Sequence, residues 1–337
     1  MEFSRRDFAK IAAGLPLAVG TNITAADTGA GTNIKGWSYM DHWSIWTPIG
    51  YQNPKTSREG MDRFVKQIAA IGFRGYDTFA TTFMSLSQMF GSPKNLMEFF
   101  QERGIEKIVG LFGGGAAHDP ATHDATFHSW EAVAKAADGL GVENWVICPG
   151  DRYWKVAPVT DEKLKNTAIL WNRVGKLAAE HGIRLGLHHE FENLGRRADE
   201  LEKLYRWTDP KYVWWFCDTA QHAIAGIDPV ALYEKYHDRC NGFHFKDTHN
   251  TDSKNEYLEP PDCEIEASVP QWFWEMGAPG GLINFPALMA ALKKHNYRGW
   301  LCAENDKVDI GSIGGTYAEA TCITKWYIDN ILSRIYS

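Results

Sequence analysis

The sequence predicts an α/β fold, a (β/α)8 TIM barrel in a single domain, and three observations indicate it. From residue 34 onward one unit repeats: a short apolar strand, a polar loop, an amphipathic helix and a turn that contains glycine. This alternation is typical of parallel βαβ units. The chain holds about eight such units, and no linker divides them. A closed barrel therefore fits better than an open doubly wound sheet, which would need fewer strands or a linker.

The elements can be placed in order along the chain from these patterns. The expected strands are residues 34–39, 73–79, 107–112, 144–148, 184–190, 213–218, 242–246 and 300–304. Helices are expected at 58–71, 129–140, 161–181, 198–207, 228–236 and 285–295, with a terminal helix over 317–335. Several expected helices end in a glycine before the next strand, as at Gly72 and Gly182. Glycine at this position supplies the left-handed residue that ends a helix.

Composition limits the class of partner. The chain has 42 acidic and 35 basic residues, a net charge of −7, so no overall basic field would draw it to nucleic acid. After the first residues, no stretch approaches the roughly 20 apolar residues that a membrane helix needs. We expect a small-molecule partner rather than nucleic acid or a membrane, and an oligomer is compatible with the sequence.

Residues 1–26 resemble a twin-arginine export signal. Arg5 and Arg6 precede Phe8, Lys10 and a weakly hydrophobic run, and small residues end the segment at a suitable cleavage site. The alternative is an ordinary helix with a chance basic start. We expect residues 27–33 to be a linker, residues 34–337 to form the barrel, and the protein to be periplasmic or otherwise exported.

Four residues of types that bind metals in proteins lie at the carboxyl ends of successive expected strands in the second half of the chain. They are Glu190, Asp218, His244 and Glu304. Because the carboxyl ends of barrel strands meet at one mouth, we expect all four side chains to point to one site. Three carboxylates and one imidazole favour Mn²⁺ or Mg²⁺, with Co²⁺ and Zn²⁺ as alternatives. The structural alternative is that each acid caps a helix or pairs with a nearby base.

Other residues near the expected mouth are candidates for binding substrate. Trp37 could offer an aromatic face to a sugar ring, although packing in the core is the alternative. His42 and Arg152 follow expected strands, and the long aromatic loop 248–282 is expected to pack as a lid. Lys246 shares a strand face with His244, so it could bind substrate oxygens or act as an acid or base. The alternative is a structural pair between Lys246 and its neighbour Asp247, which is also a candidate for substrate binding.

Several motifs in the second half resemble those of the xylose isomerase-like TIM barrels, which include sugar isomerases, sugar epimerases, inosose dehydratases and endonuclease IV. They are Cys217-Asp218-Thr219-Ala220-Gln221-His222, the segment Ala225-Gly226-Ile227-Asp228-Pro229-Val230-Ala231-Leu232, Gly242-Phe243-His244-Phe245-Lys246-Asp247, 275–285 and Ala303-Glu304-Asn305. The resemblance covers the chain from about residue 34 and implies a divalent metal held by Asp218, His244 and Glu304.

The chain departs from the family pattern at two positions. Where many relatives have a glutamate ligand, this sequence has His188, and Glu190 lies two residues further on. Strand alternation would turn both into the barrel, so we expect Glu190 as ligand and His188 as ligand or catalytic base. His222 lies one residue beyond its usual place, so contact with substrate and a structural role are both open.

The resemblance implies proton transfer next to a carbonyl, with Glu190 or His188 and Glu304 as catalytic residues. Lys246 is a further catalytic candidate because of its place on the strand face of His244. The leading hypothesis is a metal-dependent isomerase or epimerase acting on a non-phosphorylated sugar or keto-sugar. The alternative is a lyase or hydro-lyase on a 3-keto-glycoside or inosose. A second alternative is a periplasmic barrel that binds sugar without turnover.

Overall fold

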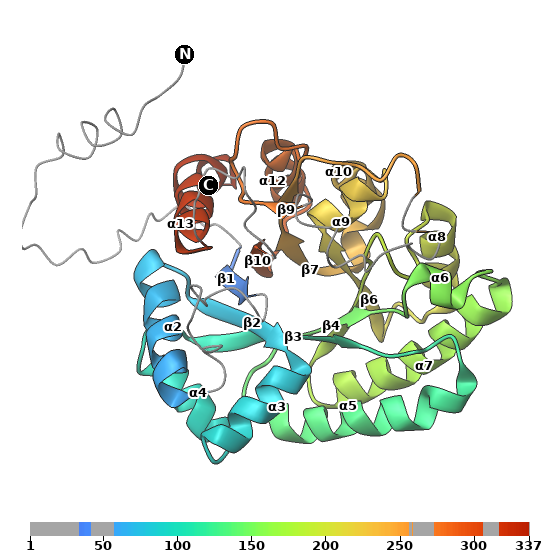
Figure 1. Cartoon of the computed structure of the whole chain (residues 1–337), viewed down its shortest axis with the longest axis horizontal. Helices are drawn as coiled ribbons and strands as arrows, with labels where there is room; N and C mark the ends of the chain where they lie inside the picture. Colours follow the sequence, from blue (N-terminus) through green and yellow to red (C-terminus); the bar gives the residue numbers. More distant parts are fainter. Residues whose placement is uncertain (1–33, 42–56, 256–257, 259–272, 306–316, 337) are drawn as a thin grey trace, which may run out of the picture. The chain divides into compact units, whose positions relative to one another are not determined.

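The structure is a computed structural model, and it describes residues 34–41, 57–255, 258, 273–305 and 317–336. Within them the chain forms one closed barrel of parallel strands surrounded by helices (Figure 1). The predicted fold class is therefore confirmed. The expected signal peptide and linker lie outside the described residues.

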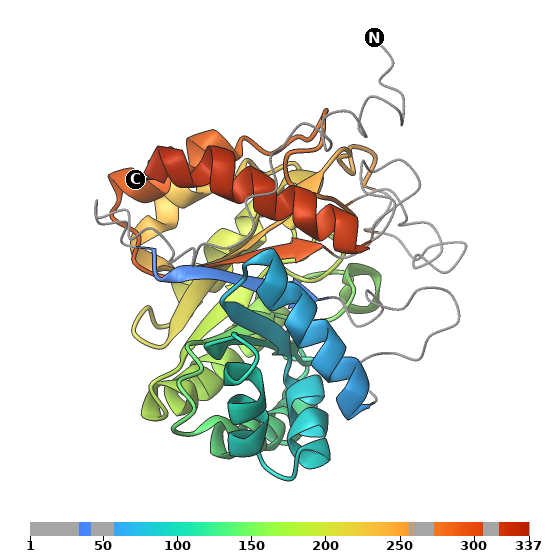
Figure 2. The same ribbon diagram turned by 90° about the vertical axis from the view of Figure 1, so that its left-hand side faces the viewer.

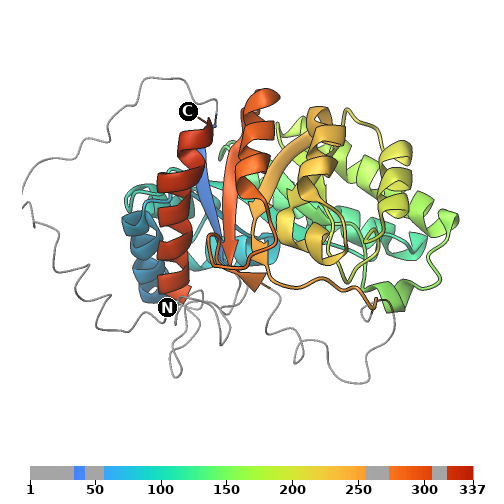
Figure 3. The ribbon, with the colours of Figure 1, turned by 90° about the horizontal axis from the view of Figure 1, so that it is seen from above.

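Eight parallel strands make the barrel. In chain order they are β1 (Gly36–Asp41), β2 (Gly75–Phe79), β3 (Lys107–Gly114), β4 (Asn144–Cys148), β5 (Arg184–His188), β6 (Val213–Asp218), β7 (Cys240–Phe245) and β10 (Trp300–Asn305). Each strand pairs with the next one in this order, and β1 pairs with both β2 and β10. The first and last strands thus close the barrel, and they lie side by side in Figure 3.

Helices cover the outside of the barrel. The longer ones are α2 (Arg58–Ile71), α3 (Ala80–Met89), α4 (Pro93–Gln101), α5 (His123–Ala137), α7 (Asp161–Glu180), α8 (Ala198–Trp207), α10 (Pro229–Tyr236), α12 (Phe285–Lys294) and α13 (Tyr317–Tyr327). Shorter turns are α6 (Tyr153–Val156), α9 (Thr219–Ile224), α14 (Ser333–Tyr336), η2 (Pro120–Thr122), η3 (His237–Arg239) and the π-helical η5 (Ile328–Leu332). Figure 2 shows α2 and α13 next to each other on one side of the barrel. None of the helices in the described segments is long and apolar enough to cross a membrane.

Helix α2 shows how local sequence sets these elements. The Ser57 hydroxyl accepts a hydrogen bond from the Gly60 amide at 3.0 Å, which satisfies one of the donors left open at a helix start. Met61, Phe64, Val65 and Ile68 then recur at helical spacing and are all buried. Gly72 ends the helix with a φ of 107°, a conformation that disfavours any side chain.

The predicted elements differ from the observed ones mainly at their ends. Strand β5 ends at His188, two residues before the predicted end. Helices α3 and α9 were not predicted, and the terminal helix contains the π-helical segment η5. Beyond β7, two short strands pair antiparallel, β8 (Asp247–Thr248) and β9 (Phe273–Trp274). This pair joins the start of the predicted loop 248–282 to Phe273 and Trp274, which lie later in the same loop.

Candidate metal centre

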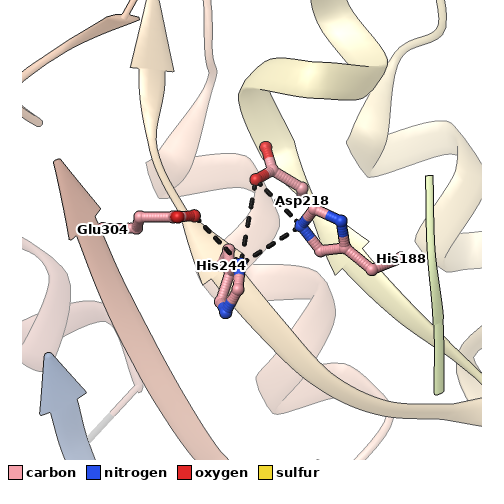
Figure 4. Close-up of side chains that lie close together, drawn as sticks. All are labelled: His188, Asp218, His244 and Glu304. Carbon is pink, nitrogen blue, oxygen red and sulfur yellow. Dashed lines mark hydrogen bonds and ion pairs between the residues drawn. The ribbon is translucent and has the colours of Figure 1, made fainter. Parts of the chain in front are cut away.

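Four side chains converge where the strands end (Figure 4). His188 and Asp218 are the last residues of β5 and β6, whereas His244 and Glu304 each lie one residue before the end of β7 and β10. All four are buried. One donor atom from each lies within 4.8 Å of the others, so the group is a candidate site for a divalent metal.

The distances show a compact cluster of two imidazoles and two carboxylates. His188 Nε2 lies 3.2 Å from Asp218 Oδ2 and 3.1 Å from His244 Nδ1. His244 Nδ1 in turn lies 2.9 Å from Glu304 Oε2 and 3.9 Å from Asp218 Oδ2. The same four interactions are drawn in Figure 4. Because the donor atoms already face one another, little rearrangement would be needed to hold one ion.

Asp218 is oriented by the helix that follows it. Its Oδ1 atom accepts a hydrogen bond from the Gln221 amide at 2.8 Å and caps the start of α9, so Oδ2 is the oxygen that faces the cluster. Burial alone would raise the pKa of Asp218, but the Lys246 ammonium and the His188 and His244 rings outweigh it. The pKa therefore lies well below its usual range, and the carboxyl is ionised and ready to bind a cation.

Lys246 lies against both acids of the cluster. Its Nζ atom is 3.0 Å from Asp218 Oδ2 and 3.0 Å from Glu304 Oε2, and the side chain is only 1% exposed. The Phe273 ring of β9 covers the ammonium, with its centroid 4.4 Å away. The structural alternative, a pair between Lys246 and Asp247, is not what the contacts show, because Lys246 pairs with Asp218 and Glu304 instead.

Glu190, predicted as the ligand after the fifth strand, lies outside this group of four. The prediction assumed that strand alternation continues to Glu190, but β5 ends at His188, so the alternation does not extend to Glu190. The Glu190 carboxylate instead accepts a hydrogen bond from Asn193 Nδ2 at 2.5 Å. It is half-buried, whereas His188 is buried and in contact with Asp218. The geometry thus supports His188 over Glu190 for this position.

Two predicted substrate-binding residues contact residues other than the four of the cluster, and a third lies outside the described residues. Trp37 packs edge-on against Phe245, with ring centroids 5.2 Å apart, among the core side chains between strands and helices. Arg152 forms an ion pair with Glu192 on the loop after β5. His42 lies outside the described residues. The contacts of Trp37 thus support the alternative that it packs in the core, and a substrate contact by Arg152 stays a prediction.

His222 and Asp247 are both buried, and each has a structural partner. His222 Nε2 accepts a hydrogen bond from Trp215 Nε1 at 3.3 Å, and burial lowers the pKa of His222 to about 4. Asp247 Oδ1 accepts hydrogen bonds from the backbone amides of Thr248 and Ile283, at 2.8 and 3.3 Å. Burial raises the pKa of Asp247 to about 7. His222 thus connects α9 to β6, and Asp247 holds the segments that follow β7, while a substrate contact by either residue stays a prediction.

The sequence reasoning missed a second buried group on the strands. A carboxylate oxygen of Asp77 on β2, a ring nitrogen of His244 and the Cys302 sulfur on β10 lie within 4.8 Å of one another. Burial raises the pKa of Asp77 to about 6. An available signal was an acid in the middle of the otherwise uncharged strand Gly75–Phe79, where a charge is costly unless it has a partner.

The chain belongs to the xylose isomerase-like TIM barrel family, whose model matches residues 65–321. The inosose dehydratase of Bacillus velezensis is 26% identical over 307 residues, which cover 86% of this chain and 96% of that protein. The inosose dehydratase of Mesomycoplasma hyopneumoniae (strain 7448) is 30% identical over 148 residues, 44% of this chain, and this match spans only 49% of that relative's length.

Solved structures share the fold at lower identity. The probable 3-DHS dehydratase of Bacillus anthracis superposes with a TM-score of 0.67 at 13% identity, covering 88% of this chain and 99% of that one. A structure of IOLI protein with a bound zinc atom gives a TM-score of 0.64 at 15% identity, covering 90% of this chain and 99% of that one. Both comparisons support the fold of the whole barrel.

Proposed function

We propose that the protein is a metal-dependent lyase or hydro-lyase that acts on a cyclic polyhydroxy ketone, such as an inosose or a 3-keto-glycoside. The observation that carries this proposal is the buried cluster of His188, Asp218, His244 and Glu304, with Lys246 against its two acids. The likeness to inosose dehydratases across 86% of the chain supports elimination over other reactions of the family.

The chemical types of the four ligand side chains determine which metal ion the cluster would prefer. Two imidazoles and two carboxylates are a softer set than the three carboxylates and one imidazole expected from the sequence. This set suits Zn²⁺, Co²⁺ or Mn²⁺ and no longer favours Mg²⁺. When bound, such an ion would polarise the ketone oxygen and make the neighbouring C–H bond more acidic.

The chain's own residues can then move the protons. We assign Glu190, which is half-buried and lies two residues after His188, as the base that takes the proton on the carbon next to the ketone. The electron pair of that C–H bond forms the new C=C bond as the β-oxygen departs. Lys246 Nζ, held at the cluster and covered by Phe273, donates the proton that this oxygen needs. The products are an unsaturated ketone and water or a free alcohol.

Isomerisation or epimerisation is the second candidate. It begins with removal of the same proton, and Glu190 and Lys246 belong to different strand–loop units, so each could return a proton at a different position. The sequence motifs favoured this reaction on a non-phosphorylated sugar. The two candidates begin with removal of the same proton and differ in whether an oxygen leaves.

Products distinguish the candidates. Purified protein loaded with Co²⁺ or Mn²⁺ is incubated in D₂O with an inosose, with a 3-keto-glucoside and with a free ketohexose, and followed by NMR. We expect loss of water or release of the aglycone, with no turnover by the Asp218→Ala variant. Deuterium exchange or an epimer without elimination would instead establish the isomerase. Tight binding without any reaction would support the sugar-binding alternative.

We further propose that residues 1–26 direct export. The support is the order of Arg5, Arg6, Phe8 and Lys10 before an apolar run. Export also agrees with a non-phosphorylated substrate, because phosphorylated sugars are metabolites of the cytoplasm.

A further inference from the structure

Asp77 is a buried acid inside the barrel that the proposed reaction does not use. It lies in the middle of β2 and is 2% exposed. Its Oδ1 atom has no hydrogen-bond partner among the described residues. Burying a carboxyl group costs several kcal/mol unless both of its oxygens are hydrogen-bonded, so its presence needs a reason.

The barrel wall is shaped to admit this carboxylate. A Cβ atom placed on Gly110 of the neighbouring strand β3 would lie only 2.1 Å from Asp77 Oδ2 and 3.1 Å from its Cγ. Any side chain at position 110 would therefore displace the carboxyl group from its place. The glycine holds room for Asp77 on the inner side of the sheet.

The neighbour of interest is His244. Its Nδ1 atom faces His188, Asp218 and Glu304, so Nε2 lies on the other edge of the ring. An Asp77 oxygen, a His244 ring nitrogen and the Cys302 sulfur all lie within 4.8 Å of one another. An imidazole that binds a metal through one nitrogen usually donates its other N–H to a carboxylate, which fixes the ring and makes it a better ligand.

We propose that Asp77 is a positioning residue for the metal centre: it accepts a hydrogen bond from His244 Nε2–H and so keeps Nδ1 free of its proton and aimed at the ion. This inference rests on the proposed function, because it requires that the cluster bind a metal. It assigns to Asp77, Gly110 and β2 a part in metal binding, although the cluster ligands come from the other half of the barrel.

The test compares metal binding in matched variants. Zn²⁺ and Co²⁺ affinities are measured by calorimetry, and the visible spectrum of the Co²⁺ protein is recorded, for wild type, Asp77→Ala and Asp77→Asn. We expect affinity to fall by about 10- to 100-fold in Asp77→Ala and the cobalt spectrum to change, as when such partners are removed from other sites. The nearly isosteric Asp77→Asn retains an acceptor oxygen and should lose less, and it serves if the alanine variant does not fold.

Asn144→Ala is the control. Asn144 is also a buried polar residue of a barrel strand, but it pairs with Asn241 at 3.0 Å. The Asn144→Ala variant should lose stability while keeping the wild-type metal affinity and spectrum.

Unchanged affinity and spectrum in both Asp77 variants would overturn the inference. Two metals per wild-type chain, falling to one in Asp77→Ala, would instead make Asp77 a ligand. No metal bound by wild type would refute the proposed function itself.

Discussion

Lys246 brings a positive charge to within 3.0 Å of a carboxylate oxygen of both Asp218 and Glu304. The same two oxygens belong to the candidate metal-binding set. A bound cation and the ammonium therefore draw on the same negative charge, at distances where repulsion between them is strong. At the scale of single residues, the Lys246 ammonium and a bound metal ion would compete for the same two carboxylates.

Replacing Lys246 with methionine should tighten metal binding by about tenfold or more, because a competing charge worth at least ~1.4 kcal/mol is removed. The metal-free variant should also be less stable, by about 3–5 kcal/mol, since two buried carboxylates lose their partner. Calorimetry with Zn²⁺ and urea unfolding measure the two effects. Lys66→Met, at an exposed surface ion pair, is the control and should change neither. Weaker metal binding in Lys246→Met would mean that the ammonium supports the ligands.

At the scale of elements, the segments following β7 hold the rim of the site. Asp247 of β8 accepts hydrogen bonds from Thr248 and Ile283, and Gly281 lies so close that an added Cβ would meet the carboxylate at 2.0 Å. Burial of this acid raises its pKa from 3.8 to about 7. The folded protein therefore retains a proton that the unfolded chain loses between about pH 4 and 7.

This pKa shift predicts that the metal-free protein loses stability as the pH rises from about 4 to 7. A shift of about 3 units corresponds to about 4 kcal/mol. Asp247→Asn keeps the acceptor oxygen without the charge, so it should remove most of this pH dependence and be more stable than wild type at pH 8. Urea unfolding of both proteins at pH 5 and pH 8 measures the difference. An asparagine variant that is less stable than wild type at both values would contradict the assignment.

Much of the element order could be predicted because apolar strand runs and helix-ending glycines are local signals. Strands β4 and β6 and helices α2 and α8 match their predicted bounds. Helix α9 was missed because its six residues directly follow β6 and depend on the Asp218 cap. Such short turns are stabilised by contacts that the sequence pattern alone does not reveal.

The site was predicted in part, for a physical reason. Asp218, His244 and Glu304 lie at or near the carboxyl ends of predicted strands, and the structure brings them together. The choice between His188 and Glu190 depended on where β5 stops pairing, and strand ends are set by neighbouring strands rather than by local preference. Asp77 was missed because its proposed role depends on contact with His244, which is far away in the sequence.

At the scale of the whole molecule, the barrel is closed by its ends. Strand β1 lies between β2 and β10, and α13 packs against α2 (Figure 2). The segment preceding β1 is therefore joined to a strand that is essential for closure. A signal of the twin-arginine kind suits this arrangement, because that route accepts proteins that have already folded around their cofactor.

Replacing both Arg5 and Arg6 with lysine should therefore stop export while leaving the barrel intact. We expect the full-length protein to accumulate in the cytoplasm of a bacterial host and the shortened form to disappear from the periplasm, as measured by fractionation and mass spectrometry. Arg58→Lys, in α2, is a control and should be exported normally. Unchanged export of the double variant would contradict the signal.

The most direct test of the account is metal affinity in two single variants, His188→Ala and Glu190→Ala. If His188, Asp218, His244 and Glu304 form the centre, His188→Ala should weaken Zn²⁺ binding by at least about 100-fold, more than losing a group outside the ligand shell usually costs. Glu190→Ala should stay within about threefold of wild type, because its carboxylate is paired with Asn193 outside the cluster. The reverse result, with affinity lost in Glu190→Ala and kept in His188→Ala, would contradict the proposed metal centre.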